Sequence, residues 1–229
     1  MEEVKTVVET NEVDNKTELK KFQTSFLLFF IGQILIVLSN LQYGSFINGI
    51  PQLIVVFGVF KYVGFIFYFL ALFFARKFNK SYFYSFIAFG LYLAVMYVAS
   101  VASYSTNPSD KYVARGLNWS VSIFECIFYV YFFNGAKLFL DKHGYTKGTD
   151  KVKILLIALV IIFAVMVAFK YLSTNRLVRS NRFANRFFLY GSWAMIFLFN
   201  LYIFILMILA FIRVRKFKKS QEGGNHEQK

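Results

Sequence analysis

The stretch from Ile154 to Leu172, ILLIALVIIFAVMVAFKYL, decides the fold class of this chain. Its first sixteen residues, 154–169, carry no charged side chain. A helix needs about 20 mainly apolar residues to cross the hydrocarbon core of a bilayer, and a backbone in that core must form its hydrogen bonds internally. The stretch is therefore typical of a membrane-spanning α-helix, and we expect much of its surface to face lipid.

Five further apolar stretches of similar length occur along the chain. Together with 154–172 they predict six spanning helices over residues 22–41, 53–75, 82–104, 117–140, 154–172 and 187–212. The joins are short and contain residues that end helices, such as the pair Asn107-Pro108 and the glycines Gly144 and Gly148. Residues 1–21 form an acidic, polar tail and residues 213–229 a basic one. We therefore predict an all-α, polytopic integral membrane protein with its helices in three hairpins.

The composition of the whole chain agrees with this prediction. Of its 229 residues 58% are hydrophobic, 21% aromatic and only 17% charged, and the mean hydropathy is +0.53. Soluble domains are about 45–50% apolar and about a quarter charged. The abundance of Phe, Tyr, Ile, Lys and Asn is typical of an AT-rich genome, so we expect a bacterial cell membrane as the location.

Basic residues predict the orientation of the helices, because Lys and Arg in short loops favour the cytoplasmic side. On the side that holds both termini we count fifteen: Lys16, Lys20, Lys21, Arg76, Lys77, Lys80, Lys142, Lys147, Lys151, Lys153, Arg213, Arg215, Lys216, Lys218 and Lys219. The opposite side has six: Lys111, Arg115, Arg176, Arg179, Arg182 and Arg186. This asymmetry predicts that both termini are cytoplasmic.

The net charge of +14 does not indicate nucleic-acid binding in this chain. Its basic residues lie in the gaps between apolar stretches and not in a soluble basic domain. In that position they favour contact with anionic lipid headgroups. The expected partners are therefore the lipid bilayer and a membrane protein, which is either a different chain or a second copy of this one.

Two ionisable residues fall inside the predicted spans. Lys61 and Glu125 each lie about 8–10 residues from the outer end of helices that run in the same direction, so they are expected at matching depth. A charge near the bilayer centre costs at least about 2.5–3.5 kcal/mol, which favours pairing between them. Such a pair is interpreted either as a structural lock between helices or as a polar site for a substrate or proton.

Other polar residues extend this candidate intramembrane site. Tyr129 follows Glu125 by four residues and shares its helical face, as do Asn118 and Ser122. Gln33 and Asn200 lie mid-way along the first and sixth predicted helices. Buried amides of this kind either line a cavity or hydrogen-bond neighbouring helices for about 0.6–2 kcal/mol each.

Four arginines form a second candidate site on the predicted outer side. Arg176, Arg179, Arg182 and Arg186 fall within an arc of roughly 120° if the segment is a short helix. The planar guanidinium group binds phosphate and carboxylate groups well. The pattern predicts contact with an external anion or a lipid headgroup, and generic headgroup contact is the alternative.

Enzyme chemistry finds little support in the sequence. Metalloprotease, serine-hydrolase and P-loop motifs are absent, and the chain has two histidines and one cysteine, Cys126. We expect no catalytic residue, metal or cofactor. Two functions stay open: a non-enzymatic accessory, sensor or immunity-type subunit that acts through contact with a membrane partner, and a small transporter or substrate-binding component of a transport system. A lipid-modifying enzyme is a weaker third interpretation, because no second catalytic group accompanies Glu125.

Overall fold

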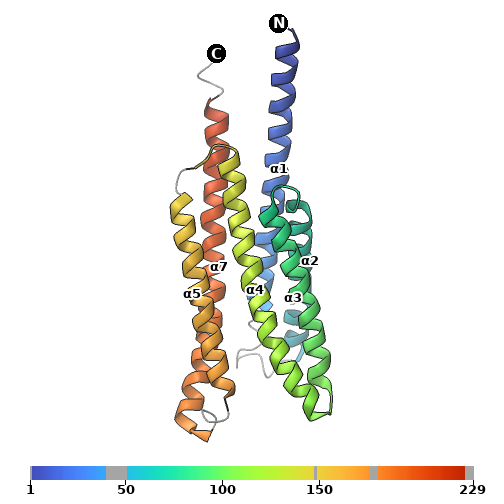
Figure 1. Ribbon diagram of the computed structural model, residues 1–229, viewed down its shortest axis with the longest axis vertical. Coiled ribbons are helices and arrows are strands. Elements are labelled where there is room, and N and C mark those ends of the chain that lie inside the picture. Colours follow the sequence, from blue (N-terminus) through green and yellow to red (C-terminus); the bar gives the residue numbers. More distant parts are fainter. Residues whose placement is uncertain (1, 40–50, 147–148, 176–179, 225–229) are drawn as a thin grey trace. The chain divides into compact units, whose positions relative to one another are not determined.

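The computed structural model describes residues 2–39, 51–146, 149–175 and 180–224. Within them the chain is all-helical, without a strand (Figure 1). Six long helices follow one another: α1 (Glu2–Ser39), α2 (Pro51–Ala75), α3 (Lys80–Tyr104), α4 (Pro108–Lys142), α5 (Thr149–Thr174) and α7 (Arg182–Gly224). Contacts between residues divide the chain into two compact units, Met1–Phe83 and Tyr84–Lys229.

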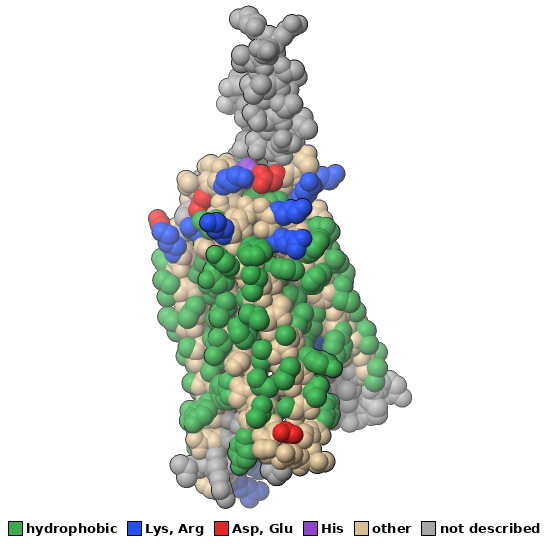
Figure 2. All heavy atoms as spheres, turned by 45° about the vertical axis from the view of Figure 1, so that its right-hand side comes forward, with side chains coloured by type: hydrophobic (Ala, Val, Ile, Leu, Met, Phe, Trp, Pro, Cys, Tyr) green, Lys and Arg blue, Asp and Glu red, His purple; other side chains and the backbone are tan. Residues whose placement is uncertain are grey.

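All six of these helices are long and apolar enough to cross a membrane. The qualifying segments are Thr17–Ser39, Val55–Ala75, Lys80–Tyr104, Tyr112–Lys142, Asp150–Ser173 and Arg182–Phe217. The prediction of an all-helical multi-pass membrane protein is thereby confirmed. Figure 2 shows hydrophobic side chains over the middle of the visible helices and most visible Lys and Arg side chains near helix ends.

The helices differ in how much of each segment is buried by the protein. In α5 the share is 17%, the smallest of the six, and in α4 it is 50%, the largest. Large apolar side chains such as Ile157 and Ile161 of α5 are exposed. In a bilayer these side chains contact lipid tails at no cost, because the tails are as apolar as leucine. The fifth span is thus the one that the rest of the chain covers least, and its contact with lipid stays a prediction.

In the first unit α1 packs against α2. The interface begins with aromatic side chains, since Phe22, Phe26 and Phe29 of α1 are all buried. Further along, the backbones approach closely at Gly32 and Gly64: a Cβ atom on Gly32 would lie 2.9 Å from the carbonyl oxygen of Gly64. Small residues at such a crossing allow tight van der Waals contact between membrane helices.

In the second unit α4 contacts three other helices. The hydroxyl of Ser85 in α3 donates to the carbonyl oxygen of Phe128 at 2.8 Å. Tyr129 meets Phe199 of α7 edge to face, with 6.0 Å between ring centroids. Near the start of α4, Trp119 contacts Tyr171 of α5 at 5.5 Å. This central position explains why α4 is the most buried of the six segments.

Asparagine side chains cap the N-terminal ends of α3 and α4. Asn79 Oδ1 accepts from the backbone N–H of Tyr82 at 3.1 Å near the start of α3. Asn107 caps α4, with Pro108 as the first helical residue. Both arrangements satisfy or avoid N–H groups that the first helical turn leaves without partners.

Candidate functional site

Gln33 lies where α1 packs against α2 and is fully buried. The hydroxyl of Tyr68 in α2 donates a hydrogen bond to Gln33 Oε1. The Tyr68 ring also stacks on Phe29, with 4.3 Å between centroids and 17° between planes. The amide predicted to lie mid-helix is thus held between two helices beside the Gly32–Gly64 crossing.

Lys61 is half-buried on α2 of the same unit. Its Nζ atom lies 5.8 Å from the centroid of the Phe65 ring, one turn further along the helix. An ammonium group at this distance is attracted by the π-face of the ring. Lys61 and Glu125 belong to different compact units, so the pairing between them stays a prediction.

Glu125 is half-buried on α4. On the same face of the helix, Ser122 contacts Lys170 of α5. Ser122, one turn before Glu125, is buried. Its hydroxyl accepts from Lys170 Nζ of α5 at 3.3 Å and donates to the carbonyl oxygen of Asn118, also at 3.3 Å. Residues three apart share a helical face, so this arrangement is a polar cluster formed by α4 and α5 within one unit.

Sequence reasoning had not assigned Lys170 to this cluster. It follows the uncharged run 154–169 and resembles a lysine that simply marks the end of a span. Its contact with Ser122 depends on how α4 and α5 pack, which the sequence pattern does not specify.

Tyr129 of α4 and Asn200 of α7 both lie in the second unit, where α4 contacts α7. Tyr129 is buried, and its ring contacts Phe199, the residue that precedes Asn200. The Asn200 amide donates to the carbonyl oxygen of Ile196 at 2.8 Å within its own helix. Asn200 is half-buried, and this internal bond satisfies one of its donors.

The arginine run is described in part. Arg176 and Arg179 lie outside the described residues, whereas Arg182 and Arg186 are exposed in the first turns of α7. Asn181 Oδ1 accepts from the backbone N–H groups of Phe183 at 3.0 Å and Ala184 at 3.1 Å. Positive side chains at a helix N-terminus add to the positive end of the helix dipole, which strengthens the local attraction for anions.

A further group of charged residues, which sequence reasoning did not single out, lies where α4 ends. Gly144, with φ of +81°, follows the helix in the left-handed conformation that glycine adopts readily. The backbone N–H of Tyr145 bonds to the carbonyl oxygen of Leu140 at 2.9 Å, and that of Gly144 to Asp141 at 3.0 Å. These two bonds form a Schellman motif, which fixes the direction of the chain after the helix.

The motif directs Tyr145 toward Arg213 of α7. Arg213 Nη2 donates to the carbonyl oxygen of Tyr145 at 3.2 Å, and the guanidinium carbon lies 5.6 Å from the centroid of the Tyr145 ring. Arg213 Nη2 also lies 3.6 Å from Asp141 Oδ1. The other oxygen of this carboxylate is 3.4 Å from Lys137 Nζ, one turn earlier in α4. We call Lys137, Asp141 and Arg213 the basic cluster.

These charges are largely shielded from solvent. The exposed fractions of the side chains are 11% for Lys137, 12% for Arg213 and 22% for Asp141. Electrostatic interactions are stronger at such positions than on an open surface. The i,i+4 spacing of Lys137 and Asp141 was a signal available in the sequence, whereas the contact with Arg213 is long-range.

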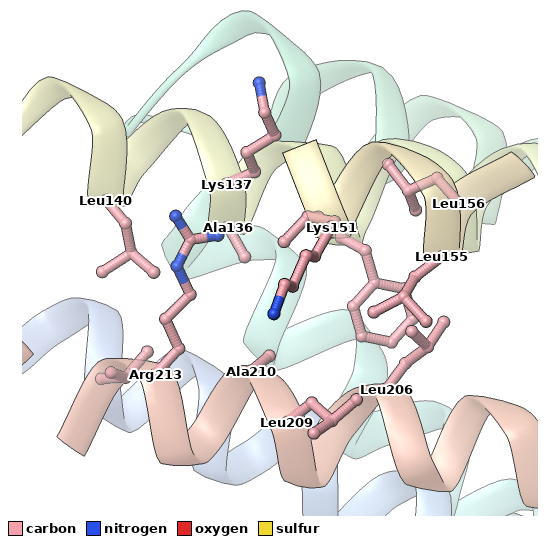
Figure 3. Close-up of a pocket in the computed structure, with 13 residues that line it drawn as sticks. Ala136, Lys137, Leu140, Lys151, Leu155, Leu156, Leu206, Leu209, Ala210 and Arg213 are labelled. Carbon is pink, nitrogen blue, oxygen red and sulfur yellow. The ribbon is translucent and has the colours of Figure 1, made fainter. Parts of the chain in front are cut away.

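A cavity of about 220 Å³ adjoins the basic cluster between α4, α5 and α7. Its wall is mainly apolar, with the cations Lys137, Lys151 and Arg213 among the lining residues. Figure 3 shows the Lys151 amine directed toward α7 and the Arg213 guanidinium directed toward α4. The described residues contain no group of three or more His, Cys, Asp or Glu side chains placed to hold a metal ion.

Comparison with known proteins adds no assignment. No protein-family model matches the chain, and no functionally characterised protein or solved structure matches it. The site must therefore be interpreted from its own chemistry. The described side chains offer hydrogen bonds and ion pairs, and the cavity offers a mainly apolar wall.

Proposed function

We propose that this chain is a non-enzymatic, multi-pass membrane protein that acts as an accessory, sensor or immunity-type subunit through contacts with a membrane partner. The main support is the length of α1. The helix begins at Glu2, although its membrane-crossing segment begins only at Thr17. About four helical turns thus precede the segment, at 3.6 residues per turn.

These turns carry a charge opposite to that of the rest of the chain. Glu2, Glu3, Glu9, Glu12 and Asp14 all fall within them. An acidic helical segment joined to a membrane anchor suits a partner that offers a basic groove or surface.

The proposal includes the arrangement of the spans. We place the six helices in three hairpins with both termini in the cytoplasm of a bacterial cell, because fifteen bases flank one side and six the other. The acidic segment of α1 would then be available to cytoplasmic parts of the partner.

The experiment is purification of tagged protein from its native host in a gentle detergent, followed by mass spectrometry of retained proteins. Wild type is compared with Glu9→Gln/Glu12→Gln and with the control Asp150→Asn, whose carboxylate is 92% exposed on α5. A stoichiometric protein retained by wild type and control but lost from the α1 variant supports the proposal. Recovery of the chain without any stoichiometric protein contradicts it.

The second candidate function is a small transporter or the substrate-binding component of a transport system. The contact of Lys170 with Ser122, one turn before Glu125, favours it, since ionisable residues within membrane spans commonly mark substrate or proton pathways. Lys61, Gln33, Tyr129 and Asn200 are further candidates for the same role.

Substitutions separate a site from a structural ion pair. Glu125→Gln and Lys61→Met are made singly and together, with Lys170→Met as a third variant, and each is scored for folding and for activity in the host. If the double variant regains what each single variant loses, the pair is structural. A double variant that folds but stays inactive supports transport.

A further inference from the structure

The cavity between α4, α5 and α7 exists because small residues line parts of its wall. Ala136 of α4 and Ala210 of α7 both line it, together with leucines from all three helices. Figure 3 shows the Lys151 amine extending from α5 toward Ala210. At about 220 Å³ the cavity exceeds the roughly 150 Å³ of engineered apolar cavities that hold benzene. It is large enough for a segment of hydrocarbon chain.

Positive charge is in excess around this cavity. Lys137, Lys151 and Arg213 line it, and Asp141 contacts two of these three cations. One carboxylate balances one cation, so this group of four side chains has a net charge of +2. Lys151 is exposed at the start of α5, where its ammonium group is accessible to a bound anion.

The cavity lies near the ends of three candidate membrane-spanning segments, and the ends of a span meet the lipid headgroups in a bilayer. The membrane-crossing segment of α4 ends at Lys142, that of α5 begins at Asp150, and that of α7 ends at Phe217. The lining residues Lys137, Lys151 and Arg213 lie within about one and a half turns of these ends. Leu155 and Leu206 continue the wall further into the spans.

We propose that this cavity is a binding site for an anionic phospholipid, whose phosphate contacts Lys151 and Arg213 and whose acyl chain enters between Leu155, Leu206 and Ala210. Basic pockets between membrane helices bind phosphate headgroups in this way. A free anion would leave the apolar wall without a ligand, and a zwitterionic lipid would bring a second cation toward Lys151. The site is separate from the arginine run and does not depend on the proposed function.

The test is native mass spectrometry of full-length protein in mixed micelles that hold equal amounts of phosphatidylglycerol and phosphatidylcholine. Lys151→Gln removes the exposed cation, and Ala210→Phe fills the cavity without changing its charge. The matched control is Lys153→Gln, which removes a 62% exposed lysine of the same helix that does not line the cavity. Circular dichroism and size-exclusion chromatography verify that each variant is folded.

We expect wild type and Lys153→Gln to retain phosphatidylglycerol in preference to phosphatidylcholine. Lys151→Gln should weaken this retention about fivefold, the effect of one basic residue near an anionic headgroup, and Ala210→Phe should reduce it to the level of phosphatidylcholine. Equal retention of the two lipids by wild type, or unchanged retention in both cavity variants, overturns the proposal. Stabilisation of lipid-free protein by inorganic phosphate, lost in Lys151→Gln but not in Ala210→Phe, would also overturn it in favour of a free anion.

Discussion

A Cβ atom on Gly64 would lie 3.0 Å from the carbonyl oxygen of Gly32, and one on Gly32 would lie 2.9 Å from that of Gly64. The two glycines are therefore reciprocal: each leaves room for the backbone of the other. Tyr68 and Ile36 close the space on either side, at 2.8 Å from the same two Cβ positions. The packing of α1 against α2 therefore leaves no room for a side chain at either glycine.

We expect Gly32→Ala and Gly64→Ala each to destabilise the α1–α2 packing by about 1–3 kcal/mol, because the added methyl group meets backbone atoms that cannot move aside. The measurement is thermal unfolding in detergent. Gly90→Ala in α3 is the control, since no atom lies within 4 Å of its Cβ position. That change should be neutral or stabilising by about 0.5–1 kcal/mol. Equal effects at all three sites would contradict the close crossing.

Asp141→Asn should destabilise the second unit by about 2–3 kcal/mol, since Lys137 and Arg213 would then face each other without the carboxylate between them. Asp150→Asn is the matched control, because Asp150 forms an exposed pair with Lys153 at 3.5 Å. Such surface pairs contribute about 0–1 kcal/mol. Chemical unfolding of both variants checks the difference. Similar losses in the two variants would show that the shielding of the basic cluster has no energetic consequence.

Gly144→Ala should cost about 1–2 kcal/mol, because the backbone there has φ of +81° and an L-residue is disfavoured in that region. No atom lies within 4 Å of its Cβ position, so the cost is conformational and not steric. Gly116→Ala within α4 has equally open space and no positive φ, and it should be neutral or slightly stabilising. Melting temperatures of the two variants compare them directly. A loss in Gly116→Ala as large as that in Gly144→Ala would argue against the conformational explanation.

The proposed orientation predicts which loops react with reagents added outside the cell. In a Cys126→Ala background, Ser109→Cys should be labelled by a membrane-impermeant maleimide on intact cells, and Thr146→Cys only after lysis. Ser109 and Thr146 are both exposed; Ser109 lies in the first turn of α4, and Thr146 follows its C-terminal end. The reverse pattern would invert the topology and place the acidic segment of α1 outside.

Much of the fold could be predicted from the sequence because the controlling signals are local. Each apolar stretch is long enough to require a helix in lipid, and Asn107-Pro108 lies where α4 begins. The limits of α1 and α7 were less predictable. Both helices extend beyond the apolar stretches, since helix propagation adds one hydrogen bond per residue and no proline interrupts either segment.

The candidate sites depend on packing and were only partly predictable. Gln33 and Tyr129 were recognised as polar groups within apolar runs, but their partners were not, and the pairing of Glu125 with Lys61 stays a prediction. The contacts Tyr68–Gln33, Lys170–Ser122 and Arg213–Asp141 each join different helices. A one-dimensional pattern gives the face on which a residue lies and not the residue that faces it. The cavity depends on how α4, α5 and α7 pack, and no single residue of the sequence indicates it.

The continuity of α1 has a mechanical consequence. Between Glu2 and Ile31 this helix contains neither glycine nor proline, so it has no residue at which kinks usually form. A displacement of the acidic turns would therefore be carried along the helix to Gly32, at its close crossing with Gly64 of α2.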